Sequence, residues 1–319
     1  MKLIITIDTE EDNWGSYHPT EYSLANINRI TELQELFDEY GAIPTYLITY
    51  SVATNPYAAS TFRAIEGQHR CEIGTHCHPW NTPPYVEETT KQNSMLCNLP
   101  ADLQFQKIKC LHEAIIHHVK VVPVSFRAGR WGYGSEVAIT LAKLGYQVDT
   151  SILPFIDWTE QFGPNFDKIS PEPYWFDPER YFMPDKAGRM LEVPATIGYL
   201  QTDFHFSNRV FNLLKKKPLK RLRLIGILDR LRLLNRVWLS PEQSSAGEMI
   251  ALMKTLMQKK MHVANLFFHS PTLEPGWTPF VKTEEDRRMF LSKIRKVLQF
   301  AKDNGIESIS LSESVKVVP

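Results

Sequence analysis

The chain has 319 residues, of which 43% are hydrophobic and 23% are charged, the balance of a globular protein with a large core. Its 36 basic and 36 acidic residues cancel, so no global field would gather nucleic acid, and nucleic-acid binding is not expected. No run of about 18 apolar residues predicts a membrane-spanning helix, and the four cysteines, which lack CxxC spacing, are expected to be free thiols.

Short β-branched runs alternate with longer segments of helical period, which is typical of βα units around a parallel sheet or barrel. The first run starts at Lys2 and leaves no room for a signal peptide, so a cytoplasmic location is expected. Eight strands are predicted: Lys2 to Asp8, Ile43 to Thr49, Cys71 to His76, Val121 to Arg127, Gln147 to Ser151, Leu191 to Ile197, His262 to His269 and Ile306 to Leu311. Five helices are predicted: Leu24 to Tyr40, Ala101 to Val119, Ser135 to Leu144, Pro241 to Lys260 and Thr283 to Asp303. The spacing favours one α/β domain over residues 1–319.

Two segments interrupt this alternation. Residues 152–190 are rich in proline and aromatic residues, and such loops often form the walls of binding sites. The alternative is that the rings pack on one another as a small satellite core. Residues 208–240 form the second insertion, in which basic residues mix with leucines between 215 and 236. This stretch could lie on an anionic membrane, meet a phosphate-bearing lipid substrate, or form a solvated helical pair that covers the barrel.

Polar side chains follow the ends of the predicted strands. Because loops after the carboxyl ends of barrel strands surround the mouth, residues at these ends are expected to meet there. The seven candidates are Asp8, Glu10, His76, His78, Arg127, Asp149 and His269.

Asp8 and Glu10 are separated by one residue, so both side chains point to the same side of an extended chain. One carboxylate could hold a metal while the other takes a proton from water. The alternative is that the acidic cluster caps a helix or is solvated in a loop.

His76 and His78 have the same spacing, and neutral imidazoles so placed are good ligands for zinc or a similar divalent ion. Two histidines and one carboxylate leave an open position, as in a hydrolytic metal centre. A single HxH pair is also compatible with ordinary hydrogen-bonded histidines.

Five motifs in chain order resemble those of the polysaccharide deacetylases, the family-four carbohydrate esterases. They are Ile5 to Glu10, Glu72 to His76, Phe126 to Gly129, Asp149 to Ser151 and Phe267 to His269. The resemblance covers residues 5 to about 280 and implies a distorted (β/α)7-8 barrel of the polysaccharide deacetylase type. It also implies one divalent metal ion and hydrolysis of N-acetyl or similar amides on sugars.

The resemblance also implies a role for each matching residue. Asp8 resembles the general base, and Arg127 the arginine that keeps this base ionised and oriented. Asp149 resembles the acidic residue that tethers the catalytic charge network, and His269 the general acid that protonates the leaving amine. His76 matches the first metal histidine.

The sequence departs from the family pattern at several positions. Thr9 replaces the second aspartate of the first motif, so the metal carboxylate is assigned to Glu10. The second metal histidine would fall at Trp80, and His78 is expected to replace it. Gly129 stands where a proline is common, and Arg130 could share the role of Arg127. The residues expected to contact the substrate are Trp80, Arg130, Trp131, Trp158 and Phe267.

The sequence thus predicts a metal-dependent hydrolase that removes an acetyl or formyl group from an amino sugar in the synthesis of cell-envelope glycan or lipopolysaccharide. The sugar could be attached to a lipid or a nucleotide. Zinc is the expected metal, although cobalt, nickel, iron or manganese would also accept nitrogen and oxygen ligands. Two alternatives remain open: a metal amidase acting on a small non-sugar amide, and an inactive barrel that binds glycan or a membrane.

Overall fold

A curled eight-stranded sheet forms the centre of the computed structural model, which describes residues 1–12, 14–15, 17, 22–217 and 219–319. Its strands in spatial order are β10 (Val263–His269), β1 (Lys2–Thr9), β2 (Thr45–Ile48), β3 (Glu72–Cys77), β4 (Ser125–Ala128), β5 (Val148–Asp149), β7 (Met190–Glu192) and β6 (Tyr174–Phe176). Neighbours are parallel except for β6 and β7. A separate antiparallel pair joins β8 (Ile197–Tyr199) to β9 (Arg236–Trp238).

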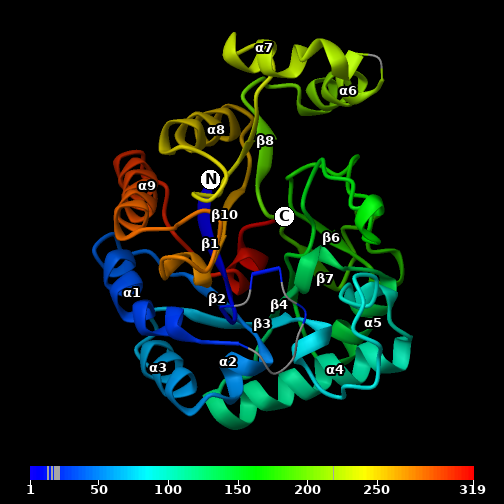
Figure 1. The fold of residues 1–319 in the computed structure, drawn as a ribbon, viewed down its shortest axis with the longest axis vertical. Helices are drawn as coiled ribbons and strands as arrows, with labels where there is room; N and C mark the ends of the chain where they lie inside the picture. Colours follow the sequence, from blue (N-terminus) through cyan, green and yellow to red (C-terminus); the bar gives the residue numbers. More distant parts are fainter. Residues whose placement is uncertain (13, 16, 18–21, 218) are drawn as a thin grey trace.

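Helices surround the sheet on its outer side (Figure 1). They are α1 (Ile30–Asp38), α2 (Tyr50–Thr54), α3 (Pro56–Glu66), α4 (Ala101–Ala114), α5 (Ser135–Lys143), α8 (Ala246–Gln258) and α9 (Glu284–Asp303). Two further helices, α6 (Phe204–Lys215) and α7 (Leu224–Arg230), project away from the sheet (Figure 1). Both α8 and α9 begin with a capping box, which is why α8 starts after Ser245 rather than at the predicted Pro241. In the described part of the chain, no helix is both long and apolar enough to cross a bilayer.

The sheet curls into a distorted barrel, as predicted. The outer edge of β10 meets the segments around β8 and β9 through single backbone hydrogen bonds. Asn265 O accepts from Thr196 N at 3.1 Å, and Phe267 N donates to Leu239 O at 3.0 Å. These bonds take the place of a continuous strand pair.

The interior of the barrel explains where the polar residues lie. Alternate residues of a strand face the same side of the sheet. Ile4 of β1 faces the inside of the barrel, where it belongs to a buried apolar cluster with residues of β2, β5, β7 and β10. The cluster comprises Ile4, Leu47, Val148, Leu191, Val193, Val263, Ile309, Leu311 and Val318. Thr6 and Asp8 follow Ile4 on this inner face, so β1 passes from an apolar interior to a polar mouth. Leu3, Ile5 and Ile7 belong to the larger core on the helical side.

Two predicted strands are wrong in detail. Pro194 has no N–H to donate to a ladder, and it divides the run Leu191 to Ile197 between β7 and β8. The run Ile306 to Leu311 forms a single bridge, from Ser308 to Leu3, because its Ile309 and Leu311 close the inner cluster instead of extending the sheet.

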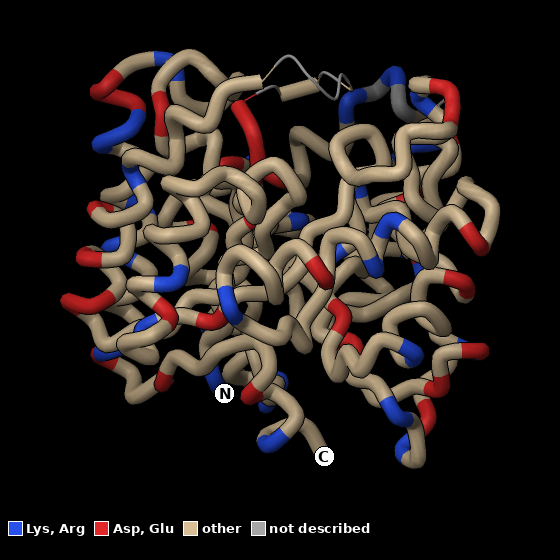
Figure 2. Tube along the Cα trace, turned by 90° about the horizontal axis from the view of Figure 1, so that it is seen from below, with Lys and Arg blue, Asp and Glu red and all other residues tan. Residues whose placement is uncertain are grey.

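Acidic and basic residues are intermingled over the trace (Figure 2), in agreement with the balanced charge. The main departure from this mixture is the excursion between β8 and β9, which carries α6 and α7 beyond β8 at one end of the longest axis (Figure 1). The predicted division into one domain with insertions at 152–190 and 208–240 stays a prediction, although this excursion starts slightly earlier, at Phe204.

Candidate active site

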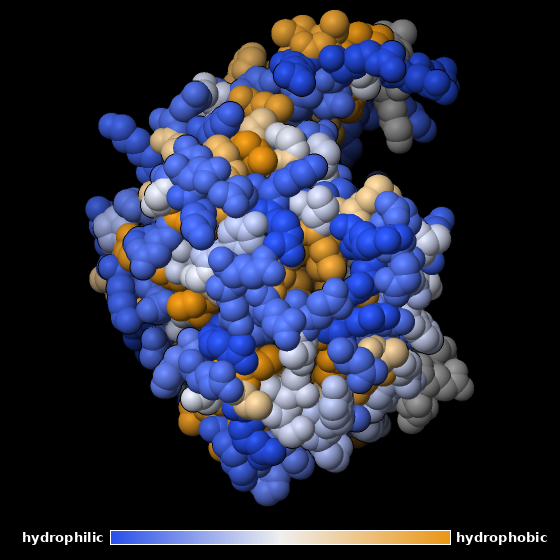
Figure 3. Space-filling model, turned by 90° about the vertical axis from the view of Figure 1, so that its left-hand side faces the viewer, coloured by the Kyte–Doolittle hydropathy of each residue, from blue (hydrophilic) through white to orange (hydrophobic). Residues whose placement is uncertain are grey.

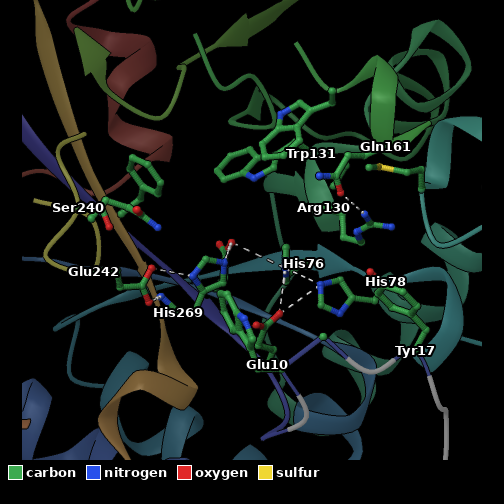
Figure 4. Close-up of a pocket in the computed structure, with 18 of the residues that line it drawn as sticks. Glu10, Tyr17, His76, His78, Arg130, Trp131, Gln161, Ser240, Glu242 and His269 are labelled. Carbon is green, nitrogen blue, oxygen red and sulfur yellow. Dashed lines mark hydrogen bonds and ion pairs between the residues drawn. The ribbon is translucent and has the colours of Figure 1, made fainter. Parts of the chain in front are cut away.

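A cavity of about 350 Å³ opens at the carboxyl ends of β1, β3 and β10 (Figure 4). Asp8, Glu10, His76, His78 and His269 all line it, although they are up to 261 positions apart in the sequence. Parallel strands deliver their last residues to one end of a barrel, which is why the side chains meet. The cavity is the meeting point that the sequence predicted.

Asp8 lies in the cavity floor and is held from beneath by Arg127, which does not line the cavity. Arg127 Nη1 donates to Asp8 Oδ1 at 2.6 Å, and its Nη2 donates to Thr6 Oγ1 at 2.8 Å and to Thr150 Oγ1 at 3.1 Å. Burial favours the neutral carboxyl, but the Arg127 guanidinium and the neighbouring histidines outweigh it and lower the pKa of Asp8. Asp8 is therefore ionised at neutral pH, with Oδ2 left to face the cavity.

Glu10, His76 and His78 form a compact set of potential metal ligands. Glu10 Oε2 lies 3.2 Å from His78 Nε2 and 3.5 Å from His76 Nε2, and the two Nε2 atoms are 2.8 Å apart. All the ligand atoms fall within 4.8 Å of one another. Figure 4 shows the three side chains converging on one point.

The hydrogen bonding of His76 fits a metal ligand. Its Nδ1 donates to the carbonyl oxygen of Arg127 at 3.1 Å, which turns Nε2 toward the cavity. His78 Nδ1 is buried and has no hydrogen-bond partner among the described residues. Burial lowers the pKa of His78 well below its usual value, so this ring is neutral. Two imidazoles and a carboxylate match the ligand set of a catalytic zinc site.

The loop after His78 is anchored from beneath. Lys107 is fully buried and donates to the carbonyl oxygens of Pro79, Thr82 and Pro84 at 2.7–2.9 Å. Trp80 stacks on the His78 ring with centroids 4.1 Å apart. Trp80 thus supports a candidate ligand as well as lining the cavity.

Gly129 leaves the space that His78 occupies. A Cβ atom at this position would lie 2.1 Å from His78 Cδ2 and 2.9 Å from the backbone oxygen of Cys77. The following two residues adopt positive φ, 53° at Arg130 and 61° at Trp131, where the backbone of ordinary residues is strained. This turn places the Trp131 ring 5.0 Å from the Arg127 guanidinium.

His269 stands on the opposite side of Asp8 from His76. Its Nε2 lies 3.6 Å from Asp8 Oδ2, and its Nδ1 lies 3.0 Å from Glu242 Oε2. Glu242 also accepts from the backbone N of His269 at 3.0 Å and from Thr272 Oγ1 at 2.7 Å. Burial opposes protonation of His269, but Glu242 and the carboxylates of the cavity raise its pKa to about 10.

The role of Glu242 was not predicted from the sequence. It lies in the short segment after β9, where the sequence predicted the first turn of a helix, and neither periodicity nor motif distinguished it from a surface carboxylate. Asp149, which was predicted to tether the charge network, is buried below the cavity. It accepts from Ser151 N at 3.0 Å and from Ser151 Oγ at 2.7 Å. The carboxylate that holds His269 is Glu242.

Asp149 and the neighbouring Glu192 form a second buried acidic pair. Burial raises the pKa of both, so the pair is expected to share a proton rather than carry two charges. Ser151 Oγ also accepts from Ala128 N at 2.8 Å, which ties the pair to the strand that carries Arg127. The contacts of Asp149 are therefore those of a support beneath β4.

The remaining predicted residues form the walls of the cavity. Phe267 packs against Trp131 and Trp238, with ring centroids 5.8 and 6.0 Å apart. Arg130 and Trp158 line the side formed by the aromatic segment. The buried rings of this segment, Phe155, Phe166 and Phe176, belong to the main hydrophobic core, so the predicted satellite core is wrong. That the segment forms a binding wall stays a prediction, although Trp158 lines the cavity. The sequence analysis did not select ten further wall residues: Trp14, Gly15, Tyr17, Met95, Ala128, Gln161, Trp238, Ser240, Gln243 and Phe280.

Solved structures with this fold carry different names. A Mycobacterium smegmatis protein described as a "putative polysaccharide deacetylase" superposes with a TM-score of 0.52 and 15% identity, over 98% of this chain and 89% of that one. The fold is that of a polysaccharide deacetylase. The 4-alpha-glucanotransferase of Thermococcus litoralis matches with a TM-score of 0.52 and 12% identity, over 99% of this chain and 40% of that one. The sequence matches no protein-family model and no curated protein. Because a transferase shares the fold, function must be argued from the cavity.

Proposed function

We propose that the protein is a metal-dependent hydrolase of the polysaccharide deacetylase family that removes an N-acyl group, acetyl or formyl, from an amino sugar. The observation that carries this proposal is the arrangement of the cavity floor. Asp8 Oδ2 lies between the Glu10–His76–His78 set, 3.8 Å from His76 Nε2, and His269, 3.6 Å from its Nε2. A proton acceptor thus stands between a potential metal site and a proton donor.

Each group has a task in amide hydrolysis. Glu10, His76 and His78 would hold one divalent ion, with zinc the best match to their donor atoms. When bound, such an ion supplies Lewis acidity, which polarises an acyl oxygen and lowers the pKa of water. Asp8 takes the proton from the attacking water, and Arg127 keeps it ionised and oriented for this step.

His269 gives its proton to the nitrogen of the leaving amine, which would otherwise be expelled as an unstable anion. Glu242 keeps the ring protonated and turned toward Asp8. Trp131, Trp158 and Phe267 would exclude water and contact the apolar faces of a sugar ring, and the volume of the cavity falls within the range of about 300–1,000 Å³ for small-molecule sites. We propose an amino sugar of cell-envelope glycan or lipopolysaccharide synthesis, attached to a lipid or a nucleotide; a cytoplasmic location stays a prediction.

The test combines metal analysis with product release. Purified protein is expected to contain about one divalent ion per chain and to release acetate or formate from a panel of N-acyl amino sugars rather than from small non-sugar amides. Replacing both histidines, His76→Ala with His78→Ala, should remove the metal and the turnover while circular dichroism stays unchanged. The matched control is His117→Ala with His118→Ala, two exposed histidines in the π-helical turn that follows α4. Full activity in the first double variant would overturn the proposal.

A further inference from the structure

The excursion between β8 and β9, which we call the arm (residues 204–236), differs in charge from the rest of the molecule. It contains ten Lys and Arg residues and a single acidic residue, Asp229, so it carries a net charge of +9. Because the whole chain is neutral, the remaining residues carry a net charge of −9. The balanced composition of the chain thus conceals one strongly basic element.

The arm also exposes large apolar side chains. Five of them are 52–61% exposed: Phe206, Leu213, Ile227, Leu231 and Leu233. Helix α7, with the sequence LIGILDR, has no buried residue. Figure 3 shows hydrophobic and hydrophilic side chains gathered side by side on the projecting end of the molecule. A seven-residue helix without burial has little stability of its own in water, since most helical stability comes from packing of an apolar face.

The base of the arm is nevertheless fixed to the barrel. Asn208 Nδ2 and Asn212 Nδ2 donate to Asp167 Oδ1 at 3.2 and 2.7 Å, and the Arg236 guanidinium lies 4.1 Å from the centroid of the Phe211 ring. The basic residues farther out lack such partners: among the described residues, Lys215, Lys216 and Lys217 have no acidic group within 4.0 Å. The base of the arm is therefore anchored to the barrel, while the positive charges of Lys215, Lys216 and Lys217 are not neutralised by nearby acidic groups.

The combination of charges and apolar groups favours one type of partner. A nucleic acid would neutralise the basic residues but leave Leu231 and Leu233 in water. A second copy of the arm would bring nine positive charges against nine. An anionic bilayer accepts both kinds of group, because apolar side chains insert at the level of the headgroups while Lys and Arg contact the lipid phosphates.

We propose that the arm docks the protein on the surface of an anionic lipid bilayer. The interaction is peripheral and independent of the hydrolase proposal, since no arm residue before β9 lines the cavity floor. Docking nevertheless bears on the cavity. Strand β9 leaves the arm at Arg236, and two residues later Trp238 lines the cavity wall, followed by Ser240 and Glu242. A bilayer-bound arm would thus lie at the start of the segment that forms this wall.

The test is flotation of the full chain with vesicles of phosphatidylcholine alone or mixed with phosphatidylglycerol. We expect binding to the anionic vesicles only, weakened by salt. Reversing three charges, Lys215→Glu with Lys216→Glu and Lys217→Glu, should reduce binding by at least about tenfold. The matched control, Lys143→Glu with Lys282→Glu and Lys296→Glu, makes the same change in net charge on exposed lysines elsewhere and should bind like the parent.

A second pair of variants tests the apolar contribution. Leu231→Ser with Leu233→Ser should also weaken flotation, whereas Val86→Ser with Val122→Ser, which changes two exposed valines outside the arm, should not. Equal losses in the arm and control variants, equal binding to neutral vesicles, or absence of flotation would each overturn the proposal. Hydrolysis of a soluble substrate should be unchanged in every arm variant, so failure of this proposal is distinguishable from failure of the hydrolase proposal.

Discussion

The two sides of the cavity come from different kinds of chain. Asp8, Glu10 and His76 stand at or just beyond the ends of β1 and β3, two regular strands of eight and six residues. The opposite side combines Trp238, from the end of the short strand β9, with Glu242 from the irregular chain that follows it and Trp158 from the aromatic segment. The positions of the side chains on the strand side follow from the alternation of residues along each strand. The positions on the loop side depend on how the loops pack in the folded protein. We therefore expect substitutions on the strand side to abolish the chemical step. Substitutions on the loop side should instead change the pKa of His269 and the affinity for the substrate.

The largest expected effect is on the strand side, at Asp8. In Asp8→Asn the amide oxygen can still accept from Arg127, so the fold should survive, but the proton acceptor is lost. We expect turnover to fall by about 10²–10⁴-fold with the metal content unchanged, as measured by product release and elemental analysis. Glu10→Gln is the comparison, because loss of this carboxylate should lower metal content and turnover together. Loss of metal in Asp8→Asn would show that Asp8 is a ligand and not the base.

The next effect tests the loop side through its pH dependence. Glu242 helps to raise the pKa of His269 to about 10, so the acid form persists well above neutral pH. In Glu242→Gln that pKa should fall. Activity ends when His269 loses its proton as the pH rises, so the variant should become inactive at a lower pH than the parent. We expect kcat near pH 8 to fall about 10- to 100-fold, with a smaller loss at acidic pH. The full pH profile of kcat is the measurement, and an equal loss at every pH would indicate that Glu242 only supports the local fold.

These two variants also separate what the sequence could predict from what it could not. The strand-end motifs predicted that Asp8, His76 and His269 would meet, because the last residues of parallel strands lie at one end of a barrel. Glu242 has no such pattern, since its position depends on how the chain returns from the arm to β10. The distorted barrel was predictable for the same reason as the strand ends. The division at Pro194 and the packing of residues 306–311 were not predictable. Both depend on which segments pack beside β10 and close the barrel interior, and this is decided by tertiary packing.

A third variant adds a single methyl group at Gly129, next to the candidate metal ligand His78. In Gly129→Ala the new methyl group would overlap the His78 ring, which must then leave the position it holds beside Glu10 and His76. Displaced supports of metal ligands typically cost 10- to 100-fold in affinity, and we expect a loss of that order in the dissociation constant for zinc. The control is Gly247→Ala in α8, where a Cβ meets no atom within 4 Å. That variant should leave zinc affinity unchanged and make the fold slightly more stable, since alanine favours the helix.

The smallest effect is expected at the aromatic wall. Trp158 lines the cavity, and its buried Nε1 has no hydrogen-bond partner among the described residues. Trp158→Phe keeps a ring but removes this donor and part of the contact area. A loss of about 1 kcal/mol corresponds to a rise in KM of roughly fivefold. Because the interaction would be the same in the bound substrate and in the transition state, kcat should stay unchanged. A fall in kcat without a change in KM would instead place this loop in the chemical step and remove the distinction between the two sides of the cavity.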